Sequence, residues 1–95
     1  MPQDVYIYEP GVRVPEYVTY VEIPRRVTKI KTNAFRDCHR LQSVTISDSV
    51  TEIGKESFLH CTDLKTIIIP GNVIKIGVGA FTNCENHYDA KTADR

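Results

Sequence analysis

The segments VTKIKTNAFRDC (residues 27–38), VTEIGKESFLHC (residues 50–61) and VIKIGVGAFTNC (residues 73–84) align without a gap when the chain is written in lines of 23 residues. The matched positions are Val27, Val50 and Val73; Ile30, Ile53 and Ile76; Phe35, Phe58 and Phe81; and Cys38, Cys61 and Cys84. A fixed period of this length indicates a solenoid, in which each repeat forms one coil. Because one coil cannot bury its apolar side chains alone, we expect a core that runs continuously along the stack.

A weaker coil precedes these three. Ile7, Val12, Val18, Val21 and Ile23 lie 23 residues before Ile30, Phe35, Leu41, Val44 and Ile46. This alignment predicts Val12 at the phenylalanine position, Pro15 at the cysteine position and an opening strand over Val5–Tyr8. Terminal repeats are commonly atypical. We therefore divide the chain into a degenerate first coil or cap (residues 1–26), repeat coils (residues 27–85) and a polar tail or weak C-terminal cap (residues 86–95).

Residues 41–63 illustrate the predicted coil. Leu41, Val44 and Ile46 alternate with polar residues, which predicts a short strand with Ser43 and Thr45 facing outward. A second extended stretch ends at Gly54, where glycine suggests a sharp or left-handed turn. Glu56–Cys61 is predicted to form about one and a half helical turns, which would place Phe58 and Cys61 on its inner face. The expected fold is thus an α+β repeat solenoid of about three to four coils, each with a short strand and a turn of helix.

The phrases Ala34-Phe35-x-x-Cys38, Ser57-Phe58-x-x-Cys61 and Ala80-Phe81-x-x-Cys84 resemble the leucine-rich repeat, in particular the BspA-like variant of surface and secreted proteins from bacteria and some protozoan parasites. The resemblance covers roughly three quarters of the chain. It departs from the commoner repeat because Ser49 and Asn72 do not form a consistent asparagine column after the strand. The resemblance implies that a curved sheet binds proteins or other ligands, and it implies no catalysis.

Composition excludes several classes of function. Lys and Arg total 12 and Asp and Glu total 12, so no net field attracts nucleic acid or an anionic membrane. No apolar stretch is long enough to span a bilayer, and Met1–Pro10 lacks the basic and apolar regions of a signal peptide. We expect no membrane insertion. The protein is expected to be cytoplasmic if the chain is complete, and secreted or on the cell surface if it is a fragment.

The cysteine column does not predict a metal site. Adjacent coils would place the cysteine backbones about 4.8 Å apart in a line, which does not provide tetrahedral ligand geometry. A disulfide between neighbours is within reach, but it would leave one cysteine unpaired. We expect buried free thiols that pack as small hydrophobic groups. His39 and His60 fall on different lines of the coil, and no nucleophile or phosphate-binding motif is present. The sequence therefore predicts no enzyme activity, no cofactor and no metal.

Charged residues alternate in sign along the columns. Lys29, Glu52 and Lys75 form one column, Arg25 precedes Asp48, and Arg40 precedes Asp63. Opposite charges on adjacent strands stabilise modestly, by about 0.2 to 1 kcal/mol for each pair. We interpret these columns as intercoil pairing, which leaves the outward side chains of the strands as the main candidates for binding.

The outward positions provide the candidate partner-binding residues, namely Tyr17, Tyr20, Arg40, Ser43, Thr45, Thr66 and Ile68. Tyrosine and arginine are enriched at the centres of protein interfaces. Three polar positions become apolar one coil later, as Thr45, Thr51 and Lys55 are followed by Ile68, Ile74 and Val78. We predict that these three residues mediate self-association, giving a homodimer through the C-terminal coil.

Two classes of function fit these observations. The first is a non-catalytic module that binds a protein partner through the strand face or the apolar C-terminal coil. One form of it would be a small intracellular inhibitor that covers a larger enzyme. The second is a structural or self-assembly segment of a larger solenoid or surface adhesin.

Overall fold

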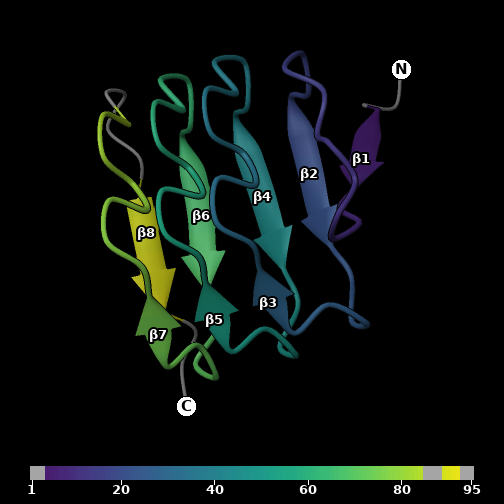
Figure 1. Cartoon of the computed structure of the whole chain (residues 1–95), viewed down its shortest axis with the longest axis vertical. Coiled ribbons are helices and arrows are strands. Elements are labelled where there is room, and N and C mark those ends of the chain that lie inside the picture. The colour runs from purple at the N-terminus through teal and green to yellow at the C-terminus, as the bar shows by residue number, and fades with distance from the viewer. Residues whose placement is uncertain (1–3, 85–88, 93–95) are drawn as a thin grey trace.

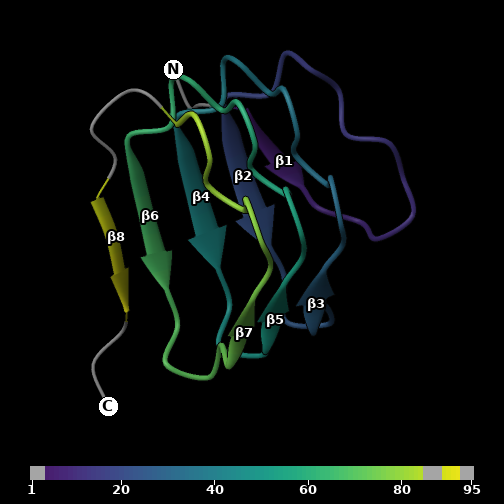
Figure 2. The ribbon, with the colours of Figure 1, turned by 60° about the vertical axis from the view of Figure 1, so that its left-hand side comes forward.

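A computed structural model describes residues 4–84 and 89–92, and its strands stack side by side as a short solenoid (Figure 1). The larger sheet contains five parallel strands, β1 (Val5–Ile7), β2 (Tyr20–Ile23), β4 (Ser43–Ile46), β6 (Thr66–Ile69) and β8 (Asp89–Thr92), in that spatial order. The smaller sheet contains three parallel strands, β3 (Lys29–Ile30), β5 (Glu52–Ile53) and β7 (Lys75–Ile76). Figure 2 shows the two sheets on different sides of the stack, joined by loops.

Strand register confirms the period of the sequence. Val21 pairs with Val44, Val44 with Ile67 and Ile67 with Ala90, each one repeat later. Lys29 pairs with Glu52, and Glu52 with Lys75, in the smaller sheet. The strand-and-turn repeats therefore stack in register, with residues of the same column opposite one another on adjacent strands.

The hydrophobic core follows the columns that recur in the sequence. The aromatic rings form a ladder, in which the centroids of Phe35 and Phe58 lie 5.2 Å apart and those of Phe58 and Phe81 lie 5.3 Å apart, with interplanar angles of 10° and 2°. Phe35, Leu41, Val50, Phe58 and Leu64 are fully buried. Each ring rests on the ring of the neighbouring coil, so the core is continuous along the stack as predicted.

The predicted helical turn is wrong, because the described residues contain no helix. Residues 31–38, 54–61 and 77–84, which we call the first, second and third turn segments, form successive tight turns instead. Asn33 and Asp37 adopt positive φ angles of 62° and 65°, and Glu56 and His60 adopt 54° and 65° at the equivalent positions. A left-handed residue at every fourth position prevents the continuous right-handed backbone of an α-helix.

Alternate backbone N–H groups of the turn segments bond between coils. The N–H groups of Asn33, Phe35 and Asp37 donate to the carbonyl oxygens of Lys55, Ser57 and Leu59 at 3.0, 2.7 and 2.8 Å. The same relation joins Glu56, Phe58 and His60 to Val78, Ala80 and Thr82. The N–H groups between them form hydrogen bonds within local turns. For example, the N–H group of Ala34 donates to the carbonyl oxygen of Lys31. These alternate N–H groups are thus satisfied by the next coil rather than by a helix.

Gly54 and Gly77 are required by close packing, not by a left-handed conformation. A Cβ atom on Gly54 would lie 2.5 Å from the backbone nitrogen of Thr32, and one on Gly77 would lie 2.4 Å from that of Lys55. Of the two turns predicted at these glycines, sharp or left-handed, the left-handed one is wrong, because neither glycine has a positive φ angle. Lys31 occupies the equivalent position in the first turn segment, where the phenol of Tyr8 and not a complete coil lies on the N-terminal side. A side chain is tolerated there for that reason.

The first coil is shorter than predicted. β1 pairs with β2 in the larger sheet with Val5 opposite Tyr20 and Ile7 opposite Glu22, an offset smaller than one repeat. The predicted alignment of Ile7 with Ile30 is therefore wrong, and Ile7 is 43% exposed. Tyr8 and not Val12 packs against Phe35, in a tilted arrangement with ring centroids 5.2 Å apart and an interplanar angle of 46°. Tyr8 is buried, whereas Val12 is 52% exposed.

The 23-residue register begins at Pro15. The N–H group of Val18 donates to the carbonyl oxygen of Pro15, as those of Leu41 and Leu64 donate to Cys38 and Cys61. Pro15 thus occupies the cysteine position, as predicted. The tail predicted over residues 86–95 lies largely outside the described residues, and within it Asp89–Thr92 form β8 against β6.

Candidate functional site

One face of the larger sheet points away from the core and carries the candidate partner-binding residues. We call it the strand face, and it is formed by Val5 and Ile7 of β1, Tyr20 and Glu22 of β2, Ser43 and Thr45 of β4, and Thr66 and Ile68 of β6. The alternate side chains of these strands, such as Val21, Val44 and Ile67, are buried. Glu22 is the single charged residue among those eight. The strand face therefore combines aliphatic, aromatic and hydroxyl side chains with little charge.

Tyrosines gather at the β1 side of this face. Tyr6, Tyr17 and Tyr20 line a hollow of about 290 Å³ together with Val5. Tyr17 is 71% exposed. It also borders a neighbouring hollow of about 360 Å³ with Arg40, His39 and Glu16. The structure thus brings together Tyr17, Tyr20 and Arg40, which the sequence placed in one candidate patch.

The remaining candidate residues meet at a second position on the strand face. Ser43, Thr45, Thr66 and Ile68 line a hollow of about 260 Å³ between β4 and β6, with Asp48 and Pro70 at its border. Ile68 is 53% exposed and contributes an aliphatic side chain to an otherwise hydroxyl-rich surface. This hollow could hold a small apolar side chain while the hydroxyl groups bond to a backbone.

Sequence reasoning missed the exposed Val5 and Ile7, and the partly buried Tyr6 that lines the tyrosine hollow. It aligned Ile7 with a buried column because it carried the 23-residue offset through the first coil. The alternation of Val5 and Ile7 around Tyr6 was the available signal, because it matches the pattern of an edge strand with two outward apolar residues.

The residues predicted for self-association do not lie on one sheet. Ile68 belongs to β6 of the larger sheet, whereas Ile74 and Val78 flank β7 of the smaller sheet. Ile74 and Val78 are 84% and 79% exposed. Ile76 of β7 is 48% exposed, although Ile30 and Ile53 in the same column are each 1% exposed. The C-terminal end of the smaller sheet is therefore an uncovered section of the core.

The cysteine column consists of free thiols. Cys38 and Cys61 are buried as predicted, and Cys84 is half-buried. The sulfur of Cys61 lies 3.1 Å from the carbonyl oxygen of Phe35, and that of Cys84 lies 3.2 Å from that of Phe58, so each thiol can donate to the preceding coil. Burial raises the pKa of the Cys38 thiol to about 11 and raises the pKa of the Cys61 thiol further. Thiols held in the protonated form are poor nucleophiles.

The described residues provide no cluster of three or more His, Cys, Asp and Glu side chains that could hold a metal ion. Asn83 contacts Nδ1 of His60 at 3.1 Å, and the two residues lie one 23-residue repeat apart. This contact joins neighbouring turn segments on an exposed surface. It gives His60 a packing role between coils.

Ion pairs lie at the sides of the solenoid. Lys29 and Glu52 pair at 3.8 Å, as their column predicted. Shorter pairs join Arg26 to Glu9 at 2.6 Å and Arg36 to Glu56 at 3.2 Å, and the columns did not predict either of them. All these side chains are substantially exposed, so each pair stabilises the fold by about 1 kcal/mol or less.

A comparison with known protein families identifies the type of repeat in the chain. A family model described as the BspA type leucine rich repeat region (6 copies) matches residues 15–94. The chain belongs to the BspA-type leucine-rich repeat family. The match begins at Pro15, the residue from which the hydrogen bonds follow the 23-residue register. Comparisons with curated proteins and with solved structures gave no match.

Membership of this family carries a general expectation. Leucine-rich repeats are protein-interaction modules and are generally not catalytic, as the sequence resemblance implied. In the part of the chain that the structure describes, no helix is long and apolar enough to cross a membrane.

Proposed function

We propose that this BspA-type repeat protein is a non-catalytic binding module that holds a protein partner on the strand face. The observation that carries the proposal is that Glu22 is the single charged residue among the eight strand-face residues of β1, β2, β4 and β6, while Ile68 and the neighbouring Tyr17 are 53% and 71% exposed. The centres of protein interfaces are depleted in charge and enriched in tyrosine.

The geometry of the strand face supports it, rather than the sides of the solenoid, as the partner-binding surface. The tyrosine hollow at β1 and β2 and the hydroxyl-lined hollow between β4 and β6 lie along the same sheet. Two hollows on a rigid parallel sheet suit a partner that inserts one aromatic or aliphatic side chain into each. The sides carry ion pairs between coils, whose charged groups already have partners.

Quantitative affinity capture from extracts of the organism that makes the protein tests the proposal. Wild-type protein is compared with Tyr17→Ala and with Ile68→Asp, and the matched control is Lys55→Asp, an exposed position in a turn segment. A true partner is enriched by the wild type and by Lys55→Asp and is lost from both strand-face variants. Equal recovery with all four proteins would contradict a role for the strand face.

A second role is favoured by one further observation. Ile76 is 48% exposed beside Ile74 and Val78, so the C-terminal end of the smaller sheet presents apolar surface and an edge strand. We propose that another coil stacks there, supplied by a second copy or by an adjoining part of a larger solenoid. Burial of such surface contributes about 25 cal/mol per Å². The structural role and the binding role use different surfaces and are compatible.

A further inference from the structure

The first turn segment contains three backbone carbonyl groups whose equivalents in the later segments accept intercoil hydrogen bonds. Carbonyl oxygens of Lys55, Ser57 and Leu59 accept intercoil hydrogen bonds, and those of Val78, Ala80 and Thr82 do the same one coil later. The equivalent carbonyl groups in the first turn segment belong to Thr32, Ala34 and Arg36. Among the described residues, these three carbonyl oxygens accept no hydrogen bond from the backbone or from a side chain.

These carbonyl groups face the N-terminal side of the stack. The first and second turn segments share their backbone conformation, with φ angles of 62° and 54° at Asn33 and Glu56 and of 65° at both Asp37 and His60. In the second segment the acceptors point at the preceding coil. In the first segment the shortened coil leaves a hollow of about 460 Å³ at that position. We call this hollow the N-terminal slot.

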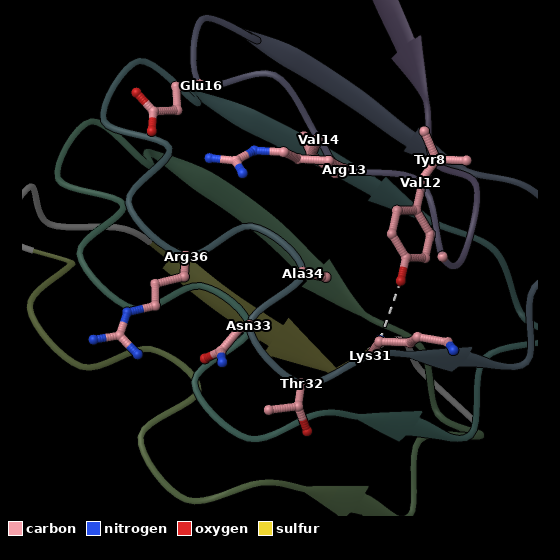
Figure 3. A pocket seen from close by; sticks show the side chains of 11 residues that line it. Tyr8, Val12, Arg13, Val14, Glu16, Lys31, Thr32, Asn33, Ala34 and Arg36 are labelled. Carbon is pink, nitrogen blue, oxygen red and sulfur yellow. Dashed lines mark hydrogen bonds between the residues drawn. The ribbon is translucent and has the colours of Figure 1, made fainter.

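Figure 3 shows the two walls of the slot, with Val12, Arg13, Val14 and Glu16 on one side and Lys31–Ala34 with Arg36 on the other. Tyr8 separates the slot from the core through its hydrogen bond to the backbone of Lys31. Arg13, Lys31 and Arg36 supply three cations to the lining, against the one carboxylate of Glu16. Arg36 pairs with Glu56 and with Asp37, but within the described residues neither Arg13 nor Lys31 forms an ion pair.

We propose that the N-terminal slot binds an extended, acidic polypeptide segment, whose alternate backbone N–H groups donate to the carbonyl oxygens of Thr32, Ala34 and Arg36. Addition of a strand to an unpaired edge is an established mode of peptide recognition, in which the main chain supplies affinity. Here the segment replaces the missing turn of the first coil and uses the hydrogen bonds that join the other coils. Its carboxylates lie near Arg13 and Lys31. A metal cation would suit the carbonyl row but not the three surrounding cations.

The experiment uses the whole chain and a displayed library of random peptides. The slot is blocked by Thr32→Trp, and the matched control is Lys55→Trp, which introduces the same side chain at the equivalent exposed position one coil later. Peptides selected on the wild type are expected to be rich in Asp and Glu. Their affinity should fall at least about tenfold for Thr32→Trp and for Lys31→Glu, and stay within about twofold for Lys55→Trp and for Ile68→Asp.

Backbone recognition is tested by methylating single amide nitrogens of a selected peptide. Methylation at alternate residues should weaken binding at least about tenfold, and methylation at the residues between them should have little effect. Amide shifts in the NMR spectrum should change most for residues 31–36. Thermal unfolding of each variant verifies that it is folded. Failure to select any peptide, equal loss in both tryptophan variants, or indifference to methylation would each overturn the proposal. Loss of binding in Ile68→Asp would show that the peptides bind the strand face, and it would also overturn the proposal.

Discussion

The phenol oxygen of Tyr8 accepts a hydrogen bond from the backbone N–H group of Lys31 at 3.2 Å. Lys31 aligns with Gly54 and Gly77, whose N–H groups donate to a strand of the preceding coil. The regular acceptors are the carbonyl oxygens of Ile30 and Ile53. From residue 4 onward, the first coil forms no strand of the smaller sheet, so the Tyr8 side chain replaces a strand carbonyl and also caps the aromatic ladder on Phe35.

Substitution of Tyr8 by Phe separates these two contributions. Tyr8→Phe keeps the ring over Phe35 but removes the acceptor of the Lys31 N–H group, so the free energy of unfolding should fall by about 1 kcal/mol. Tyr8→Ala also removes the ring and should cost about 3 to 5 kcal/mol. Urea titrations measure both values, and Tyr17→Phe on the surface is the control. A Tyr8→Phe protein as stable as the wild type would show that this hydrogen bond does not contribute.

Gly54 and Lys31 occupy the same column, but alanine should destabilise the protein only at Gly54. Gly54→Ala places a Cβ atom against the backbone nitrogen of Thr32, so it should destabilise the protein by about 1 to 3 kcal/mol. Lys31→Ala lies beside the shortened coil and should change stability by about 0.5 kcal/mol or less. Denaturation midpoints of the two variants test this directly. Equal effects would mean that close coil packing does not explain the glycine.

Much of the fold could be predicted because the repeat leaves little freedom. Columns such as Phe35, Phe58 and Phe81 require equivalent positions to stack, and this predicted the parallel register and the core. The turn segments were not predictable in the same way, because apolar residues three apart fit a helix and also fit the observed turns. The decisive feature was the left-handed backbone at Asn33 and Asp37, since asparagine and aspartate adopt it more readily than most residues.

The surfaces at the two ends were harder to predict than the stack. The strand-face positions of Ser43 and Thr66 follow from alternation alone, and the structure places them in one hollow. The role of Tyr8 depends on a coil that departs from the 23-residue period, so the aligned columns of the sequence do not indicate it. The carbonyl row of the N-terminal slot is a property of the backbone, so side-chain patterns carry no signal for it.

The cysteine column should be slow to react in the native state, in order of burial. Cys61 should label slowest and Cys84 fastest, because burial raises the pKa of each thiol and labelling requires the thiolate. Labelling should accelerate as the pH rises, and all three thiols should react rapidly in denaturant. Mass spectrometry of timed samples gives the rate at each site. Rapid native labelling of Cys61 would contradict the stacked core.

Self-association through the C-terminal coil predicts a mass that depends on concentration. The wild type should approach a dimer, and the variant Ile74→Asp should remain a monomer, because charge opposes the burial of this exposed side chain beside β7. The control is Thr51→Asp, which introduces the same charge one coil earlier. Light scattering coupled to chromatography measures each mass. A wild-type chain that stays monomeric at high concentration would rule out this dimer.

The central claim, that the strand face holds a protein partner, is tested most directly by site-specific photocrosslinking. A photoreactive phenylalanine is placed at Thr45 on the strand face or at Lys55 in the second turn segment, and each protein is irradiated in extracts of its source organism. The strand-face position should give a discrete adduct that excess wild-type protein abolishes and excess Ile68→Asp protein does not. A competable adduct formed from Lys55 and not from Thr45 would contradict the claim.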